Sequence, residues 1–347
     1  MDITQTKLAA LAGVSQNTVH RALHGMGGVS EKTRQVIHEL ASTHGYRLNS
    51  AARNMRTGRT GQVGVLVLDS PAHSYIRAPL LELTWGINAG LEAGGFVTTL
   101  VRLNDVDRPD AENARIFREH LLDGVVVANM LPDFLEEKVR KLVPRHVWLD
   151  TDVWEPTLCL QRDEELAGRL AARALIEAGH RKLVYFVRPE ARSLHGEGSM
   201  THYSGAARMR GLQMEAEAAG VDLIPLDAKE IEDFDTAALD KLLRDGAGLF
   251  ARRMSEARGI AAHTLAGRFS GQWGRDCSIA SADDGADFHW WWPQLARVSF
   301  DRVAMGRAAA DMMVALLNGA DGDGETVQIE SQRIAGEFHS GTTIRRA

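Results

Sequence analysis

The stretch TQTKLAALAGVSQNTVHRALHG, residues 4–25, predicts two short helices joined by a tight turn. Leu8 and Leu11 recur at helical spacing and give the first helix an apolar face. Gly13 ends this helix, because glycine readily adopts the left-handed conformation found just after a helix. Ser15 caps the second helix, since its hydroxyl can accept a backbone N–H that the first turn leaves unbonded.

The second helix is expected to be apolar on one side only. Val14, Val19 and Leu23 supply that side, and the rest of the segment is polar, with Gln16, Asn17, His20, Arg21 and His24. A short helix with amide and guanidinium groups near its leading end suits the major groove of DNA, as in a helix-turn-helix. An amide can pair bidentately with adenine, and an Arg with guanine. Two surface helices with an ordinary turn are the alternative interpretation.

The charge distribution favours the DNA interpretation. Residues 1–60 carry eight Lys and Arg against three acidic residues, a formal charge of +5, which leaves −11 for the rest of a chain whose net charge is −6. A basic module on an acidic body suits a module that binds a polyanion and a body with another task. A chain of 347 residues is long enough for two or three domains.

The two cysteines, Cys159 and Cys277, form neither a metal-binding spacing nor a disulfide framework, so a reducing cytoplasm is the expected setting. The N-terminus lacks an apolar signal segment, and apolar runs such as VGVLVL at 63–68 are too short to cross a bilayer. We therefore expect a soluble cytoplasmic protein with no membrane partner.

A third helix is predicted from Ser30 to about Gly45, followed by a linker. Asn49 could cap a fourth, short helix that is basic at Arg53 and carries one large apolar side chain, Met55. So short a helix is marginal in water. The segment is either a frayed linker or a helix that folds against DNA and presents Met55 as an apolar wedge.

From residue 61 onward, apolar strand-like runs alternate with helical stretches, which predicts parallel sheets covered by helices on both faces. The expected strands are 63–69, 96–103, 124–129, 146–150, 182–187, 221–226, 247–252, 277–283, 296–300 and 326–331. The pattern restarts after Leu158, so we expect two doubly wound α/β lobes with a ligand between them, at the carboxyl ends of the strands.

These patterns predict a DNA-binding head, a linker or hinge helix, and a two-lobed body. The expected bounds are 1–47 for the head, 48–60 for the hinge and 61–347 for the body. Within the body we expect lobe 1 to hold about 61–159 and 297–319, and lobe 2 about 160–296 and 320–347.

A set of segments carries a family resemblance: AGVSQNTVHRALHG, VSEKTR, HGYRLNSAARNM, TGQVGVLVLD, LLDGVVV, EAGHRKLVYF and FDRVAMGRAAADMMVALLNG. In these segments the chain resembles the LacI/GalR family of bacterial transcriptional regulators, from about residue 3 to 343, strongly in the first 60 residues and patchily between about 190 and 295. The resemblance implies a multidomain protein with an all-α, lambda-repressor-like head and a periplasmic-binding-protein-like α/β body. It also implies homodimers on pseudo-palindromic DNA operators, and a small effector, a sugar or sugar derivative, that shifts DNA affinity.

The resemblance also implies roles for individual residues of the head. The family's base-reading positions match Gln16, Asn17 and Arg21, and Thr18 matches a position that helps to hold the DNA backbone. His20 departs from the family, because Ser is common at that position.

In the hinge segment, Asn49 matches the start of the family's hinge helix, and Met55 matches an apolar minor-groove wedge, usually Leu, that can unstack a base step. Leu48 replaces the usual Pro, which removes a rigid φ restraint and could loosen the hinge. The complete expected DNA-binding set is Ser15, Gln16, Asn17, Thr18, His20, Arg21, Asn49, Arg53 and Met55.

For the effector site the resemblance implies that Arg208 grips ligand oxygens, that Asp283 accepts sugar hydroxyls and that Tyr75 is an aromatic residue near the ligand. Arg253-Met254 replaces the family's usual Asn-Asp pair. Arg208 and Arg253 together could favour an acidic ligand, because a guanidinium fork suits a carboxylate. Alternatively, Arg253 lies on the surface and the pocket is remodelled.

The loop with Trp290, Trp291 and Trp292 could stack on a sugar face, but packing between lobes or subunits is the more common use of such aromatics. No phosphate-binding Gly loop, zinc spacing or calcium loop is present, and no nucleophile accompanies the acidic pairs. We therefore expect a DNA-binding regulator, with a repressor favoured, that needs no cofactor, metal or catalytic residue. A small-molecule binding protein without a regulatory role is the alternative.

Overall fold

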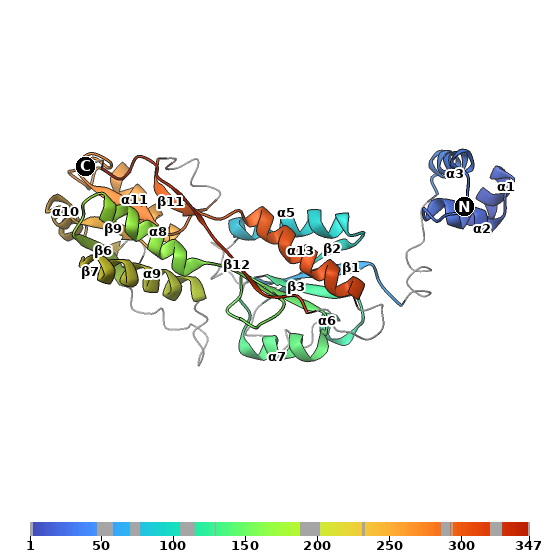
Figure 1. Cartoon of the computed structure of the whole chain (residues 1–347), viewed down its shortest axis with the longest axis horizontal. Coiled ribbons are helices and arrows are strands. Elements are labelled where there is room, and N and C mark those ends of the chain that lie inside the picture. The colour runs from blue at the N-terminus through green and yellow to red at the C-terminus, as the bar shows by residue number, and fades with distance from the viewer. Residues whose placement is uncertain are drawn as a thin grey trace. The chain divides into compact units, whose positions relative to one another are not determined.

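The computed structural model describes residues 3–46, 58–69, 77–104, 115–128, 130–187, 202–230, 233–285, 292, 294–319 and 328–345. The chain divides into two compact units, Met1–Thr60 and Gly61–Ala347, which are described separately below as the head and the body (Figure 1). Most of the expected hinge, residues 48–57 of 48–60, lies outside the described residues, as does residue 47 at the end of the expected head.

Within residues 3–46, the head contains three helices, α1 (Gln5–Ala12), α2 (Gln16–Leu23) and α3 (Glu31–Thr43). Each begins at a hydroxyl cap, because Thr4, Ser15 and Ser30 accept the backbone N–H of the residue three positions later. Gly13 ends α1 in the left-handed conformation, with φ of 64°. The predicted pair of helices and its turn are therefore confirmed.

The core of the head is narrow. It contains Leu8, Ala9, Val19, Ala22, Ile37 and Ala41. Leu11 and Val36, which helical periodicity places on the core faces, are 53 % and 40 % exposed. Three short helices enclose only a thin apolar stripe, so residues at its edges stay in contact with water.

The first lobe of the body contains a parallel six-stranded sheet in the order β12-β5-β4-β3-β1-β2. Its strands are β1 (Gln62–Asp69), β2 (Val97–Asn104), β3 (Gly124–Ala128), β4 (His146–Leu149), β5 (Cys159–Arg162) and β12 (Gln332–Ile334). The helices of this lobe are α5 (Arg77–Ala93), α6 (Arg115–Arg118), α7 (Asp133–Leu142) and α13 (Arg302–Gly319). Helices α5 and α13 lie side by side on one face, and α7 packs on the other (Figure 1).

The second lobe contains a seven-stranded sheet in the order β13-β11-β10-β9-β6-β7-β8, parallel except at its two edge strands. Its strands are β6 (Lys182–Val187), β7 (Asp222–Glu230), β8 (Asp233–Phe234), β9 (Gly248–Ala251), β10 (Ser278–Ser281), β11 (Ala296–Ser299) and β13 (Glu337–His339). Helices α8 (Glu164–Glu177) and α9 (Tyr203–Ala219) cover one face, and α10 (Thr236–Arg244) and α11 (Met254–Leu265) cover the other.

Among the strands that the structure describes, the chain crosses between the lobes three times, after β5, after β11 and after β12. The expected lobe bounds differ from the structure at all three places. Strand β11 stays in the sheet of lobe 2 up to Ser299, although residues 297–319 were expected in lobe 1. Strand β5 extends to Arg162 in lobe 1, and the C-terminal segment is not wholly in lobe 2, because β12 pairs with β5 in the sheet of lobe 1. The strand predicted at 326–331 is instead found at Gln332–Ile334.

Within the described part of the chain, no helix has both the length and the apolar character that crossing a membrane requires.

Candidate functional site

Helix α2 turns its polar side to solvent. Ser15, Gln16, Asn17 and Arg21 are exposed, and Thr18 and His20 are half-buried. The opposite side of the helix carries Val19 and Ala22, which are fully buried in the head core. The hydroxyls of Ser15 and Thr18 are hydrogen-bonded at 2.8 Å, which holds the leading end of the helix. The six residues predicted to bind DNA in the head therefore lie along one exposed helix.

The Arg21 side chain is exposed, but it is folded back along the end of α2. Its Nε donates a hydrogen bond to the carbonyl of Gly27 at 2.8 Å. The turn that supplies this carbonyl is itself held by Arg34 of α3, which donates to the carbonyls of Ala22 at 3.0 Å and Met26 at 2.9 Å. The end of α2 is thus tied to α3 through side-chain contacts to the backbone.

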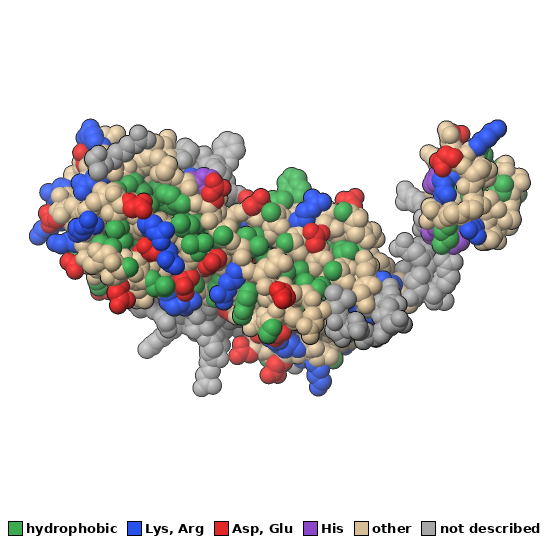
Figure 2. Space-filling model, viewed as in Figure 1, with side chains coloured by type: hydrophobic (Ala, Val, Ile, Leu, Met, Phe, Trp, Pro, Cys, Tyr) green, Lys and Arg blue, Asp and Glu red, His purple; other side chains and the backbone are tan. Residues whose placement is uncertain are grey.

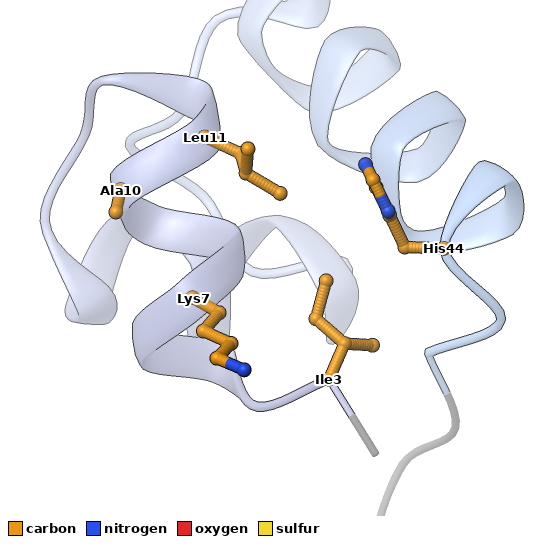
Figure 3. Close-up of a pocket in the computed structure, with 5 residues that line it drawn as sticks. All are labelled: Ile3, Lys7, Ala10, Leu11 and His44. Carbon is orange, nitrogen blue, oxygen red and sulfur yellow. The ribbon is translucent and has the colours of Figure 1, made fainter. Parts of the chain in front are cut away.

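A hollow of about 420 Å³ lies elsewhere on the head, between α1 and the end of α3 (Figure 3). It is lined by Ile3, Lys7, Ala10, Leu11 and His44. No residue of α2 lines it, so it is separate from the expected DNA-binding side.

Four predicted site residues lie outside the described residues: Asn49, Arg53, Met55 and Tyr75. Their roles stay predictions. Trp290 and Trp291 lie outside as well, but Trp292 is half-buried and packs edge-on against Trp273, with ring centroids 5.9 Å apart. Trp292 therefore serves packing within lobe 2.

In the body, polar side chains gather where strands end between the lobes. Arg208, on α9, is 1 % exposed. Its Nε and Nη2 donate to the carboxylate of Glu164 at 2.6 and 2.7 Å, and its Nη1 lies 2.9 Å from Oδ2 of Asp283. The predicted effector residues Arg208 and Asp283 are therefore brought together, but with a third residue that the sequence analysis did not assign to the site.

Arg162 connects the two lobes at the same place. This residue ends β5, and its guanidinium binds Asp150 of lobe 1 through Nε at 3.1 Å and Nη2 at 3.0 Å. Its Nη1 reaches Glu164 at 2.8 Å and Asp283 at 3.6 Å, both in lobe 2. The Tyr203 hydroxyl, on α9, donates to Asp150 at 2.7 Å.

A second connection lies at the start of α13. The Nη1 of Arg302 donates to Oδ1 of Asp284 at 2.7 Å, and its Nη2 lies 3.4 Å from Asp283. Ser299 also donates to Asp284. A cavity of about 190 Å³ adjoins this pair, and Glu82 of α5 contributes to its wall. We refer to Asp150, Arg162, Glu164, Tyr203, Arg208, Asp283, Asp284 and Arg302 as the interlobe network.

The charges of this network determine its protonation. Burial alone would raise the pKa of Asp150, but Arg162, His202 and hydrogen bonds outweigh it and hold this pKa well below its usual range. The pKa of Asp283 is lowered in the same way, since Arg208, Arg162 and Arg302 outweigh its burial. Burial and the neighbouring Asp150 raise the pKa of Tyr203, so its hydroxyl stays a hydrogen-bond donor.

The charges of the interlobe network indicate whether the site favours an acidic ligand. Two carboxylates, Glu164 and Asp283, already neutralise Arg208, so this guanidinium does not supply the unpaired positive charge that an acidic ligand needs. Arg253 is half-buried rather than on the surface, and a Cβ at Gly205 would lie 2.8 Å from its Nη2. The site therefore offers paired charges with hydrogen-bonding capacity instead of an excess of positive charge.

Sequence reasoning left six members of the interlobe network out of the site: Asp150, Arg162, Glu164, Tyr203, Asp284 and Arg302. The first two stand directly at the ends of β4 and β5, where the expected ligand cleft lies. A search for charged residues at the ends of strands would have found Asp150. Arg162 was missed because β5, with the sequence CLQR, is short and half polar.

The comparisons with known proteins agree with this architecture. Residues 6–49 match the description "Bacterial regulatory proteins, lacI family", and residues 172–337 match "Periplasmic binding protein-like domain". The HTH-type transcriptional regulator CelR of Thermobifida fusca is 25 % identical over 327 residues, covering 91 % of this chain and 92 % of CelR. The maltose regulon regulatory protein MalI of Escherichia coli K12 is 29 % identical over 53 % of each chain.

Solved structures show the same fold. The lac repressor dimer bound to operator and an anti-inducer aligns over 99 % of this chain and 100 % of its own, with a TM-score of 0.71 and 17 % identity. The CelR–cellobiose complex aligns over 98 % of this chain and 99 % of its own, with a TM-score of 0.62 and 21 % identity.

A helix-turn-helix head joined to a two-lobed α/β body defines a class of DNA-binding transcriptional regulators whose body senses small molecules. Within that class, this chain belongs to the LacI family of bacterial regulatory proteins.

Proposed function

We propose that this protein is a cytoplasmic repressor that binds a pseudo-palindromic DNA site as a homodimer and changes its DNA affinity when a sugar-like effector binds between the lobes. The carrying observation is the polar side of α2, where Gln16, Asn17 and Arg21 lie opposite the buried Val19 and Ala22. Amide and guanidinium groups on such a helix match the hydrogen-bonding edges of adenine and guanine.

The interlobe network supports a neutral, hydroxyl-rich effector. Carboxylates that are ionised and guanidinium groups that are paired can exchange hydrogen bonds with sugar hydroxyls without a change in net charge. A carboxylated ligand would instead add negative charge beside Asp150, Glu164 and Asp283. The cellobiose in the CelR complex belongs to the favoured class.

An apolar surface on lobe 1 supports the homodimer. Leu81 and Trp85 on α5 are 65 % and 69 % exposed, and Val97 and Leu100 on the edge strand β2 are 63 % and 55 % exposed. Figure 2 shows hydrophobic side chains at the surface over this part of the body. Large exposed apolar residues one helical turn apart, as Leu81 and Trp85 are on α5, are typical of interfaces.

DNA recognition is tested by selecting duplexes from a random pool with the full chain and measuring affinity for the selected and scrambled duplexes by fluorescence anisotropy. We expect a preference of about 10³-fold or more for the selected duplex. The double variant Gln16→Ala/Asn17→Ala should lose most of this preference while keeping the salt-dependent binding to scrambled DNA. Equal affinity of the wild-type chain for both duplexes would refute the proposed function.

The effector is tested by thermal shift of the full chain with neutral sugars and with sugar acids of matched size. Neutral sugars should raise the melting temperature, and an Asp283→Asn variant should weaken the effect. If sugars bind but leave DNA affinity unchanged, the protein is a sugar-binding protein without a regulatory role. Sedimentation velocity at micromolar concentration measures the oligomeric state.

A further inference from the structure

The side chain of Arg21 is folded back along the end of α2. Its Nε donates to the Gly27 carbonyl at 2.8 Å, and its guanidinium packs against Gly28. A Cβ built at Gly28 would lie 2.9 Å from Nη2 and 3.2 Å from Cζ of Arg21. A side chain at position 28 would therefore displace the guanidinium from this place. The arrangement therefore depends on Gly28.

The turn that accepts Arg21 is fixed from a second side. Arg34, on α3, donates to the carbonyls of Ala22 and Met26, and so ties the end of α2 and the following turn to the head core. Gly28 has φ of 84°, a conformation that favours glycine. The Gly27 carbonyl is thus held in place before any DNA arrives.

We propose that the turn Gly25–Gly28 is a positioning element for base reading by Arg21, which deepens the proposed function and rests on it. With Nε held by the Gly27 carbonyl, the pair of donors that remains for a base is Nη1 and Nη2. Guanine presents two acceptors, O6 and N7, at a spacing that such a pair fits bidentately. The turn thereby leaves Nη1 and Nη2 of Arg21 as the donors that bind guanine.

The benefit of this contact is preorganisation. A long Arg side chain loses rotamer freedom when it binds, and fixing it beforehand reduces that loss. Releasing Arg21 from the turn should weaken binding to a guanine-containing selected duplex by about twofold to tenfold. Binding to scrambled DNA, which depends on charge, should stay unchanged because the charge of Arg21 remains.

The test variant is Gly28→Ala, whose methyl group displaces the guanidinium. Gly45→Ala is the matched control, because Gly45 also lies in the head with a positive φ, 62°, but a Cβ there meets nothing within 4 Å. Both are compared on the selected duplex, on the same duplex with the guanine replaced, and in an Arg21→Ala background. We expect Gly28→Ala to lose the preference for the guanine-containing duplex and Gly45→Ala to keep it. In the Arg21→Ala background, Gly28→Ala should cause no further loss of this preference.

A second variant, Arg34→Met, loosens the same turn without adding a side chain next to Arg21. It should reduce guanine preference as Gly28→Ala does, at temperatures where circular dichroism shows a folded head. Equal losses for Gly28→Ala and Gly45→Ala, or full preference in Arg34→Met, would overturn the positioning role. A wild-type chain with no selected duplex would instead refute the proposed function itself.

Discussion

Replacing Arg162 with Met should destabilise the body strongly. The side chain of Arg162 is 9 % exposed and makes ion pairs with Asp150 and Glu164. Methionine fills a similar volume but leaves both carboxylates without this cation. Removing one partner of a buried ion pair costs about 3–5 kcal/mol. Glu164 keeps Arg208, and Asp150 keeps the Tyr203 hydroxyl, so we expect a loss near the lower end, about 3 kcal/mol.

The loss should depend on pH in a specific direction. In the wild-type chain the pKa of Asp150 is lowered on folding, so its stabilisation is present above the unfolded pKa of about 3.9 and is lost only as pH falls through the lower folded value. Without Arg162, burial raises the pKa of Asp150 instead. Acidification then protonates the buried carboxylate and removes its unpaired charge, so the Arg162→Met variant loses less stability at lower pH. The stability difference between wild type and variant should therefore shrink between pH 7 and pH 5.

Chemical denaturation followed by tryptophan fluorescence measures this effect, because all 7 Trp of the chain lie in the body. Arg169→Met is the control, since the Arg169 side chain is 39 % exposed and pairs with Glu215 at the surface. A surface pair of this kind contributes about 1 kcal/mol or less. Similar losses for the two variants, or a difference that grows on acidification, would refute the reasoning about the interlobe network.

Four further outcomes are expected. Gly306→Ala should destabilise the body by several kcal/mol, about 3 or more, because its Cβ would lie 2.1 Å from the Leu83 carbonyl; a denaturation curve checks this. Burial, with nearby acids, raises the pKa of Cys277 to about 12, so a thiol reagent at pH 8 should modify it only after unfolding. Ile37→Ala should cost about 2–5 kcal/mol of head stability by circular dichroism, since Ile37 is 0 % exposed. Trp85→Arg should shift sedimentation toward monomers if the apolar surface of lobe 1 forms the dimer.

The head could be derived from sequence almost completely, because its signals are local. The Ser caps, the left-handed Gly13 and the polar residues of α2 each act within one helical turn. Periodicity failed only for Leu11 and Val36, whose burial depends on how little core three helices enclose. Local rules predict helix ends well, and they predict burial less well when the core is small.

In the body, too, local features were predicted well and features that depend on distant residues were not. Long apolar strands were predicted close to their observed bounds, whereas β5 and β12 were missed or misplaced because they are 4 and 3 residues long with mixed polarity. Their identity as strands comes from pairing with each other across the lobe 1 sheet, which is non-local. The same holds for Arg162 and Arg302, whose roles arise only once strands far apart in sequence converge.

The interlobe network also bears on how a ligand can move the lobes. Tyr203–Asp150 and Arg302–Asp284 both join residues of different lobes, so opening the cleft separates them. A buried ion pair such as Arg302–Asp284 gains Coulomb energy but loses hydration, and the two contributions nearly offset each other. Separation into water is therefore expected to cost little net free energy, so the proposed function expects the open and closed arrangements to be close in stability. A ligand must supply about 5.5 kcal/mol of differential affinity to convert a 1:99 population into its inverse. When the two arrangements start closer together, a few hydroxyls that bind only the closed network would supply enough. Under the proposed function we therefore expect a neutral polyol to suffice, and a charged ligand to disturb the balance of charges in the network.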